Sequence, residues 1–366
     1  MPPIKIPVAI LTPKTTSVSL TIFCLVGQTT FFSSAIDSLT NPSGLTDLIF
    51  VSDSNMDFPI MPRDDILHNS SCCMAKAKKI TKAIIAVAGY GTRFLPATKN
   101  QPKEMLPIID KPIIHYLVEE CVQSGIKDII MVTRAGQGIM EDYFDSHIEL
   151  EHMLDVNGKE ALLKTVKEIP LLANFVYVRQ KKNLPYGNAT PLLVASPLID
   201  DDEAYAYLFG DDLVLSKKPC LKQLIEVYEN EKCDGVIATQ EVPPNEVNRY
   251  GIVKFNSKTN EFESIVEKPE IGKAPSNFAD FGRFILNHKT IKALRKLETG
   301  LGGELWLVDA VTKAKNDGAR FLVHKVEGEW LTTGDPLRYM KAQVRFALER
   351  KDIGEEFSEF LKSLKL

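Results

Sequence analysis

The residues best suited to chemistry lie close together, in residues 88–107, directly after a short apolar run. Gly89 and Gly91 allow a tight turn whose backbone N–H groups can approach an anion without obstruction by a Cβ atom. Side-chain donors that could face the same anion follow them: Thr92, Arg93 and Lys103. The segment therefore predicts a binding loop for a phosphate chain.

Two common phosphate-binding motifs are excluded. The dinucleotide fingerprint G-x-G-x-x-G needs glycine at position 94, which is Phe94, and the P-loop pattern G-x-x-x-x-G-K-[ST] is absent. A Gly-x-Gly turn alone is most often a plain turn beside solvated charges. The Gly-x-Gly turn therefore does not identify a function unless polar residues elsewhere in the chain support it.

Further polar residues follow candidate strands. Asp211 and Asp212 offer hard carboxylate ligands for a magnesium ion, although two such residues after a strand are more often a solvated turn or helix cap. Gln180 carries an amide that could pair with a nucleobase edge. Glu267 and Lys268 end another candidate strand, where an exposed ion pair is the simpler interpretation.

The elements around these residues predict a doubly wound, mostly parallel α/β sheet. Short apolar runs indicate buried strands, and they alternate with segments of helical period. The expected strands are residues 82–88, 128–133, 175–179, 204–209 and 235–239, and the expected helices are residues 112–124, 189–196 and 219–231. Ligands bind such sheets at the carboxyl ends of the strands, where Gly89, Gln180 and Asp211 all lie.

The second half predicts a smaller antiparallel or mixed sheet beside the first. Its expected strands are residues 251–255, 262–267 and 281–286. Helices are expected near residues 304–317 and 335–350, followed by a helical tail over residues 351–366.

Residues 1–78 differ in composition from the rest of the chain. They are rich in Ser, Thr, Pro and Asn and show no sustained helix or strand period, whereas regular patterns begin after Lys79. We expect an irregular N-terminal extension that is either disordered or spurious, the latter if translation begins downstream. The catalytic domain is expected to span residues 79–350.

Composition and charge exclude some classes of protein. The net charge of −4 gives no reason to expect a nucleic-acid partner. The apolar run at residues 17–27 is shorter than the roughly 20 residues needed to span a bilayer, and it only loosely imitates a signal peptide. The six cysteines show no zinc-ligand spacing. We therefore expect a cytoplasmic protein with no membrane partner.

The pattern Gly-x-Gly-Thr-Arg, followed by Pro and by Pro-Lys-x-x-x-Pro, resembles the signature of the sugar nucleotidylyltransferase superfamily. Within it the bacterial UTP-glucose-1-phosphate uridylyltransferases are most similar. Residues 96–99, 102–107 and 143–154 carry that likeness, which extends from about residue 79 to about residue 350.

The resemblance implies a role for each matching residue. Base and phosphates of UTP would be held by Ala88, Gly89, Gly91, Thr92, Gln180 and Gly187. The catalytic residues would be Arg93, Lys103 and Lys268, and the sugar phosphate would contact Gly251, Glu267 and Lys268. The cofactor would be Mg²⁺, held by Asp211, and relatives commonly form homo-oligomers, either dimers or tetramers.

Two departures from the family pattern leave questions open. Relatives usually carry Asp-x-Gly near the end of the domain, but here Thr332 replaces that acid, so Asp335 is an uncertain second metal ligand. Residues 185–189 read Pro-Tyr-Gly-Asn-Ala in place of Gly-Leu-Gly-His-Ala, which affects the expected base and ribose contacts.

The expected reaction is in-line attack of glucose 1-phosphate on the α-phosphorus of UTP, giving UDP-glucose and pyrophosphate. Because the second pKa of a phosphate monoester is about 6, the nucleophile is already ionised at pH 7 and needs no general base. Two alternatives remain open at this point: the same chemistry with dTTP or GTP, and a non-catalytic regulator that binds nucleotide sugars.

Overall fold

The computed structural model describes residues 38–40, 46–48 and 79–364. The chain divides into two units, Met1–Met74 and Ala75–Leu366. In the first, β1 (Ser38–Thr40) pairs antiparallel with β2 (Thr46–Leu48). Apart from this pair, the prediction of an irregular extension over residues 1–78 lies outside the described residues.

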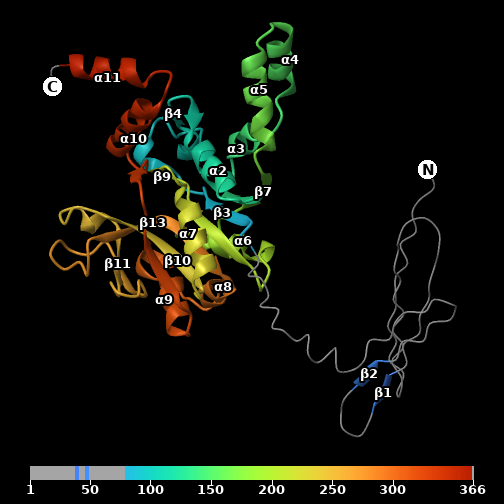
Figure 1. The fold of residues 1–366 in the computed structure, drawn as a ribbon, viewed down its shortest axis with the longest axis vertical. Helices are drawn as coiled ribbons and strands as arrows, with labels where there is room; N and C mark the ends of the chain where they lie inside the picture. Colours follow the sequence, from blue (N-terminus) through green and yellow to red (C-terminus); the bar gives the residue numbers. More distant parts are fainter. Residues whose placement is uncertain (1–37, 41–45, 49–78, 365–366) are drawn as a thin grey trace, which may run out of the picture. The chain divides into compact units, whose positions relative to one another are not determined.

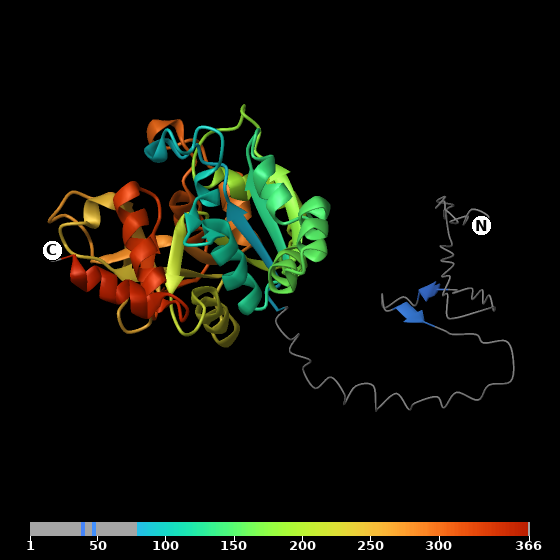
Figure 2. The ribbon, with the colours of Figure 1, turned by 90° about the horizontal axis from the view of Figure 1, so that it is seen from above.

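The second unit is built on one nine-stranded mixed sheet (Figures 1 and 2). Its strands run in the order β12-β11-β13-β8-β3-β6-β7, with β10 and then β14 attached at β13. Their bounds are β3 (Lys82–Ala86), β6 (Asp128–Thr133), β7 (Asn174–Arg179), β8 (Ala204–Phe209), β10 (Gly235–Glu241), β11 (Gly251–Phe255), β12 (Phe262–Glu267), β13 (Phe278–Asn287) and β14 (Phe321–Lys325).

The central strands β8, β3, β6 and β7 are parallel, as predicted. The antiparallel strands of the second half do not stand apart from them, because β13 pairs with β8 and carries β11, β12 and β10 with it. Two small antiparallel pairs lie outside the sheet: β4 (Pro107–Ile108) with β5 (Lys111–Pro112), and β9 (Asp212–Leu215) with β15 (Glu329–Thr332).

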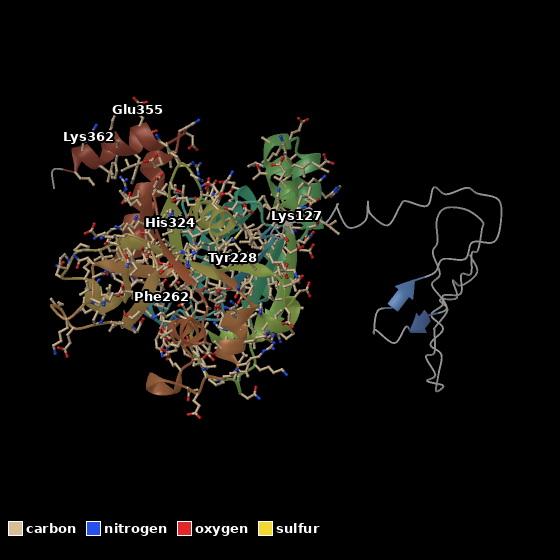
Figure 3. All side chains as sticks on the ribbon, turned by 60° about the horizontal axis from the view of Figure 1, so that its bottom comes forward. Lys127, Tyr228, Phe262, His324, Glu355 and Lys362 are labelled. Atoms are coloured by element: carbon tan, nitrogen blue, oxygen red, sulfur yellow. The ribbon has the colours of Figure 1, made fainter. Side chains whose placement is uncertain are left out.

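Two layers of helices cover the sheet. On one face α2 (Ile113–Gln123) and α7 (Cys220–Asn230) pack with Ala83 and Ile85 of β3. On the other face α6 (Thr190–Ala195), α8 (His288–Leu294) and α9 (Leu307–Asn316) pack with Ile84. Successive residues of β3 thus enter opposite cores, and each fully buried isoleucine stabilises the fold by about 1.5–3 kcal/mol. Figure 3 shows the side chains on this framework.

The remaining helices lie outside these layers. Figure 1 shows α4 (Ile148–Val156) and α5 (Glu160–Glu168) as a hairpin that projects from the sheet, after the short α3 (Gly138–Tyr143). α10 (Pro336–Glu349) is followed by α11 (Gly354–Ser363). Over the part of the chain that the structure describes, no helix is both long and apolar enough to cross a membrane.

Candidate active site

The Gly-rich loop leaves the centre of the sheet at the carboxyl end of β3. Gly91 has a φ of 62°, and a Cβ atom there would lie 3.2 Å from the Lys103 side chain and 3.3 Å from that of Thr98. The Thr98 hydroxyl donates to the Gly91 carbonyl at 2.7 Å. The left-handed turn and this close packing explain why glycine is required at position 91.

Lys103 and Asp211, which are 108 positions apart, form an ion pair with a 2.5 Å separation between Nζ and Oδ2. Burial by itself would lower the pKa of Lys103, but the Asp211 carboxylate outweighs it and raises that pKa. Burial likewise opposes ionisation of Asp211, and the Lys103 charge holds the pKa of Asp211 below its usual value. Both groups are therefore charged at neutral pH.

Arg93, from the Gly-rich loop, lies close to Asp211 through a contact with Gly334. Its Nη1 donates to the Gly334 carbonyl at 3.3 Å, and a Cβ atom on Gly334 would lie 3.0 Å from Asp211 Oδ2. Thr333 donates to the Asp211 carbonyl through both its N–H and its hydroxyl, at 2.7 and 2.8 Å. Thr92 and Gly91 line a 470 Å³ cavity together with Arg93 and Lys103.

Asp212 faces a different environment from Asp211. Its Oδ1 accepts a hydrogen bond from Trp330 Nε1 at 2.7 Å, and the residue is buried. Burial, followed by the neighbouring Asp211 charge, raises the pKa of Asp212 to about 7. Thr332 lies opposite Asp212 in the β9–β15 pair, in the position where a second acid was expected.

Asp335 already has partners as the N-cap of α10. Its Oδ1 accepts the Arg338 N–H at 3.0 Å, and its Oδ2 forms a 2.6 Å ion pair with the Arg338 guanidinium. Among the described residues no group of three or more His, Cys, Asp or Glu side chains could hold a metal. Arg338 occupies both oxygens of Asp335, whereas the ion pair with Lys103 uses Oδ2 of Asp211 and leaves Oδ1. Asp211 is therefore the more suitable of the two carboxylates, and a metal there would need oxygen ligands from outside the protein.

A 250 Å³ cavity lies between the Gly-rich loop and the strand ends, and we call it the Gln180 cavity. The predicted residues on its wall are Ala88, Gly89, Lys103, Gln180, Gly187 and Asp211. The Gln180 side-chain oxygen Oε1 is buried and has no hydrogen-bond partner among the residues that the structure describes. An unpaired buried acceptor is costly, so a ligand with a matching donor would bind there favourably.

The loop at residues 185–189 is fixed against residues 305–307. Gly187 has a φ of 133°, and a Cβ atom there would lie 2.1 Å from the Leu305 carbonyl oxygen. Ala189 donates to that carbonyl at 3.0 Å. Asn188 Oδ1 accepts the Leu307 N–H at 2.7 Å and so supports the start of α9. Gly187, a predicted nucleotide-binding residue, thus lies on the wall of the Gln180 cavity, in a loop that departs from the family pattern.

Glu104 is a site residue that the sequence interpretation missed. It lines the Gln180 cavity and is only 1% exposed, and within the described part of the chain its Oε2 has no hydrogen-bond partner. Burial raises the pKa of Glu104 to about 7, and the Lys103 charge opposes that rise. The signal was present in the Pro-Lys-Glu-Met-Leu-Pro motif, but an acid next to a lysine in a loop suggests an exposed pair.

A third cavity, of 640 Å³, lies where β11, β12 and β13 meet, and we call it the Glu267 cavity. The three residues predicted to contact the sugar phosphate, Gly251, Glu267 and Lys268, line it together with Arg93 and Asp211. A Cβ atom on Gly251 would lie 3.1 Å from Glu267 Oε2, so glycine keeps this wall open.

Lys268 lines the Glu267 cavity and lies close to the Gln180 cavity. Its Nζ lies 3.5 Å from Glu267 Oε1 and 5.6 Å from the ring centroid of Trp306, which lines the Gln180 cavity. Asp211 lines both cavities. Ligands in the two cavities would therefore meet at Asp211, whose ion-pair partner Lys103 lines the Gln180 cavity.

Other residues of the Glu267 cavity were not predicted: Arg249, Tyr250, Asp280, Phe281, Trp330 and Arg338. Phe281 and Trp330 stack with ring centroids 5.2 Å apart. These residues come from four separate segments, and no local pattern in the sequence links them.

Comparisons with known proteins show the family of this chain. The family described as Nucleotidyl transferase matches residues 82–348. UTP--glucose-1-phosphate uridylyltransferase 2 of Staphylococcus saprophyticus is 45% identical over 293 residues, which cover 79% of this chain and 99% of the relative. The corresponding enzyme of Staphylococcus epidermidis is 42% identical over 290 residues, with 78% and 99% covered.

Solved structures show the same relationship. UDP-glucose pyrophosphorylase from Acinetobacter baumannii has a TM-score of 0.70 and 34% identity, covering 78% of this chain and 99% of that one. A UDP-glucose pyrophosphorylase complexed with UDP-glucose has a TM-score of 0.65 and 35% identity, covering 74% and 100%. The chain belongs to the nucleotidyl transferase family.

Proposed function

We propose that this protein transfers the uridylyl group of UTP to glucose 1-phosphate, giving UDP-glucose and pyrophosphate. The observation that carries the proposal is the meeting of two cavities at one charged centre. The Gln180 cavity has the unpaired amide and the glycine-lined wall that a nucleotide needs, and the Glu267 cavity has the carboxylate and lysine that suit a sugar phosphate.

The Gln180 cavity would take UTP. Gln180 would pair with the uracil edge in this cavity. The phosphates would extend into the adjoining 470 Å³ cavity, where Gly89, Gly91 and Thr92 would present backbone and hydroxyl donors. Arg93 and Lys103 would neutralise the triphosphate and the pyrophosphate that leaves.

The Glu267 cavity would take glucose 1-phosphate. Glu267 would accept hydrogen bonds from sugar hydroxyls, Gly251 would leave room for the ring, and Lys268 would hold the attacking phosphate. Aligning two anions and neutralising their charge supplies most of the catalysis in such a reaction, and no general base is needed.

We propose magnesium as the cofactor, with Asp211 as its protein ligand. Magnesium commonly keeps several waters and binds through one or two carboxylates plus phosphates, which fits a site with one available acid. When bound, it would supply positive charge between the phosphates of the two substrates. The helix-cap contacts of Asp335 argue for Asp211 as the main ligand.

We assign the activity to residues 79–350, because the family match at residues 82–348 and both cavities fall within them. A chain of residues 74–366 is expected to keep the activity of the full chain. A homo-oligomer, either dimer or tetramer, is also part of the proposal, and light scattering at several protein concentrations tests it. The use of UTP favours a cytoplasmic location.

A pyrophosphate-release assay tests the function. UTP, dTTP, GTP and ATP would each be combined with glucose, galactose and mannose 1-phosphates, with and without magnesium. We expect the fastest release with UTP, glucose 1-phosphate and magnesium together. Faster release with dTTP or GTP would change the assigned substrates, and no release in any combination would instead favour a nucleotide-sugar-binding regulator.

A further inference from the structure

β13 carries a bulge beside the Glu267 cavity. Thr239 and Ile237, two positions apart on β10, pair with Asp280 and Phe284, four positions apart on β13. Within the bulge Gly282 has a φ of 76°. Bulges next to functional sites commonly redirect a side chain, and this one sets the direction of Asp280 at the cavity wall.

The two carboxyl oxygens of Asp280 have different surroundings. Oδ1 accepts the Gly282 N–H at 2.8 Å, a local turn that supports the bulge. Oδ2 accepts a hydrogen bond from no group among the described residues. One oxygen is therefore structural, and the other remains available to a ligand in the cavity.

The charges around Asp280 affect its protonation. Burial, and next the charges of Glu267 and Asp212, raise the pKa of Asp280 to about 8, while the hydrogen bond from Gly282 opposes that rise. The carboxyl group therefore keeps its proton at pH 7. Since Oδ1 accepts from Gly282, the proton belongs on Oδ2, where it can be donated to a hydroxyl oxygen.

The rest of the cavity suits a sugar ring beside Asp280. Phe281 and Trp330 provide stacked aromatic surface, and Glu267 provides an acceptor. A neutral donor and an acidic acceptor on the same wall match hydroxyl groups, which can both donate and accept.

We propose that Asp280 is a sugar-selecting residue, whose Oδ2 side hydrogen-bonds one hydroxyl group of the hexose 1-phosphate. This inference rests on the proposed function, because it needs the sugar phosphate in the Glu267 cavity. The bulge fixes the direction of the carboxyl group, so a sugar in which that hydroxyl is missing or inverted leaves Asp280 unpaired. The expected discrimination is about 10- to 100-fold in kcat/KM.

Two substitutions separate the role of Asp280 in the bulge from its role in the cavity. Asp280→Ser keeps a short oxygen that can accept the Gly282 N–H but cannot reach the cavity. Asp280→Asn keeps both the acceptor for Gly282 and a donor at the cavity. The measurement is kcat/KM at saturating UTP for glucose 1-phosphate and for its 2-, 3-, 4- and 6-deoxy analogues.

We expect Asp280→Ser to lower kcat/KM for glucose 1-phosphate by about 10- to 100-fold. For the one deoxy analogue that lacks the contacted hydroxyl, Asp280→Ser should lower kcat/KM by less than about threefold. Asp280→Asn should stay within about fivefold of the unmodified protein. The proposal is overturned if Asp280→Ser costs the same factor with every sugar, if it costs less than threefold with glucose 1-phosphate, or if Asp280→Asn is equally slow.

The unmodified protein distinguishes the two levels of failure. If it releases no pyrophosphate from UTP and glucose 1-phosphate, the proposed function is wrong. If it is active and Asp280→Ser loses the same factor with all five sugars, only the role of Asp280 is wrong.

Discussion

Asp211 lines both cavities, and its ion-pair partner Lys103 lines the Gln180 cavity. Each compensates the charge of the other in a partly buried position, so removing either one leaves an uncompensated charge among phosphates. Lys103, proposed to neutralise the leaving pyrophosphate, is therefore in direct contact with Asp211, the proposed metal ligand.

At the scale of single residues, Lys103→Ala and Asp211→Ala should each lower kcat by at least about 100-fold, because removing one preorganised charge from a transition state typically costs 10²–10³. Initial rates of pyrophosphate release measure the loss. Lys99→Ala removes an exposed lysine of the same loop and should change the rate less than twofold. Near-normal rates in either site variant would show that the pair is not catalytic.

Glu104 predicts a pH dependence of stability. The folded protein holds the Glu104 proton up to about pH 7, whereas the unfolded chain releases it near its ordinary pKa of 4.5. The stabilisation from the protonated group is therefore complete below pH 4.5 and is lost as the pH rises to 7, by about 3 kcal/mol. Glu104→Gln cannot ionise and should escape this loss.

Urea unfolding at pH 5 and pH 8 measures the effect. The free energy of unfolding of Glu104→Gln minus that of the unmodified protein should be larger at pH 8 than at pH 5, because only the unmodified protein loses stability as the pH rises. Glu149→Gln, on the exposed face of α4, should show no such change with pH. An equal difference at both pH values for Glu104→Gln would mean that Glu104 is ionised in the folded state.

At the scale of elements, the loop at residues 185–189 and the start of α9 form one wall of the Gln180 cavity. Their contact depends on Gly187, because both its φ and the adjacent Leu305 backbone exclude a side chain. Asn188, which departs from the family pattern, still stabilises the loop, because its Oδ1 accepts the Leu307 N–H at the start of α9.

Gly187→Ala should weaken UTP binding at least about tenfold and lower the free energy of unfolding by about 1–3 kcal/mol, through backbone strain and a clash that must move Leu305. Calorimetric titration with UTP and urea unfolding measure the two effects. Gly158→Ala is the matched control, because its φ is also positive but no atom lies within 4 Å. Equal effects in both variants would show that strain alone is responsible.

At the scale of the whole molecule, Arg283 ties the site to the core. It is fully buried on β13, forms a bidentate pair with Glu120 of α2 at 3.2 and 3.3 Å, and donates to the carbonyls of Phe209 and Asp212. The strand end that carries Asp211 is therefore held by a helix on one face of the sheet.

Arg283→Met should lower the free energy of unfolding by about 3–5 kcal/mol, because it leaves the Glu120 carboxylate buried without its partner. The double variant Arg283→Met/Glu120→Leu should recover part of that loss, and Arg345→Met at an exposed ion pair should cost less than about 1 kcal/mol. No recovery in the double variant would indicate that the backbone contacts of Arg283 matter more than the ion pair.

The sequence by itself determined many of the strands and helices, and it predicted a phosphate-binding loop. Four strands have the predicted bounds: residues 128–133, 204–209, 251–255 and 262–267. Their bounds could be predicted because the hydrophobic pattern of a strand involves only neighbouring residues. The Gly-rich loop and its cations were likewise readable, since glycine and charge act locally.

Only the tertiary structure decided which groups act together. Nothing near Glu104 in the sequence shows that it is buried beside Gly210, which follows a distant strand. Asp280 reaches the cavity only through a bulge whose partner strand lies about 40 residues away. Periodicity fixes which face of a strand is buried, but strand order and burial between distant segments fix which side chains meet.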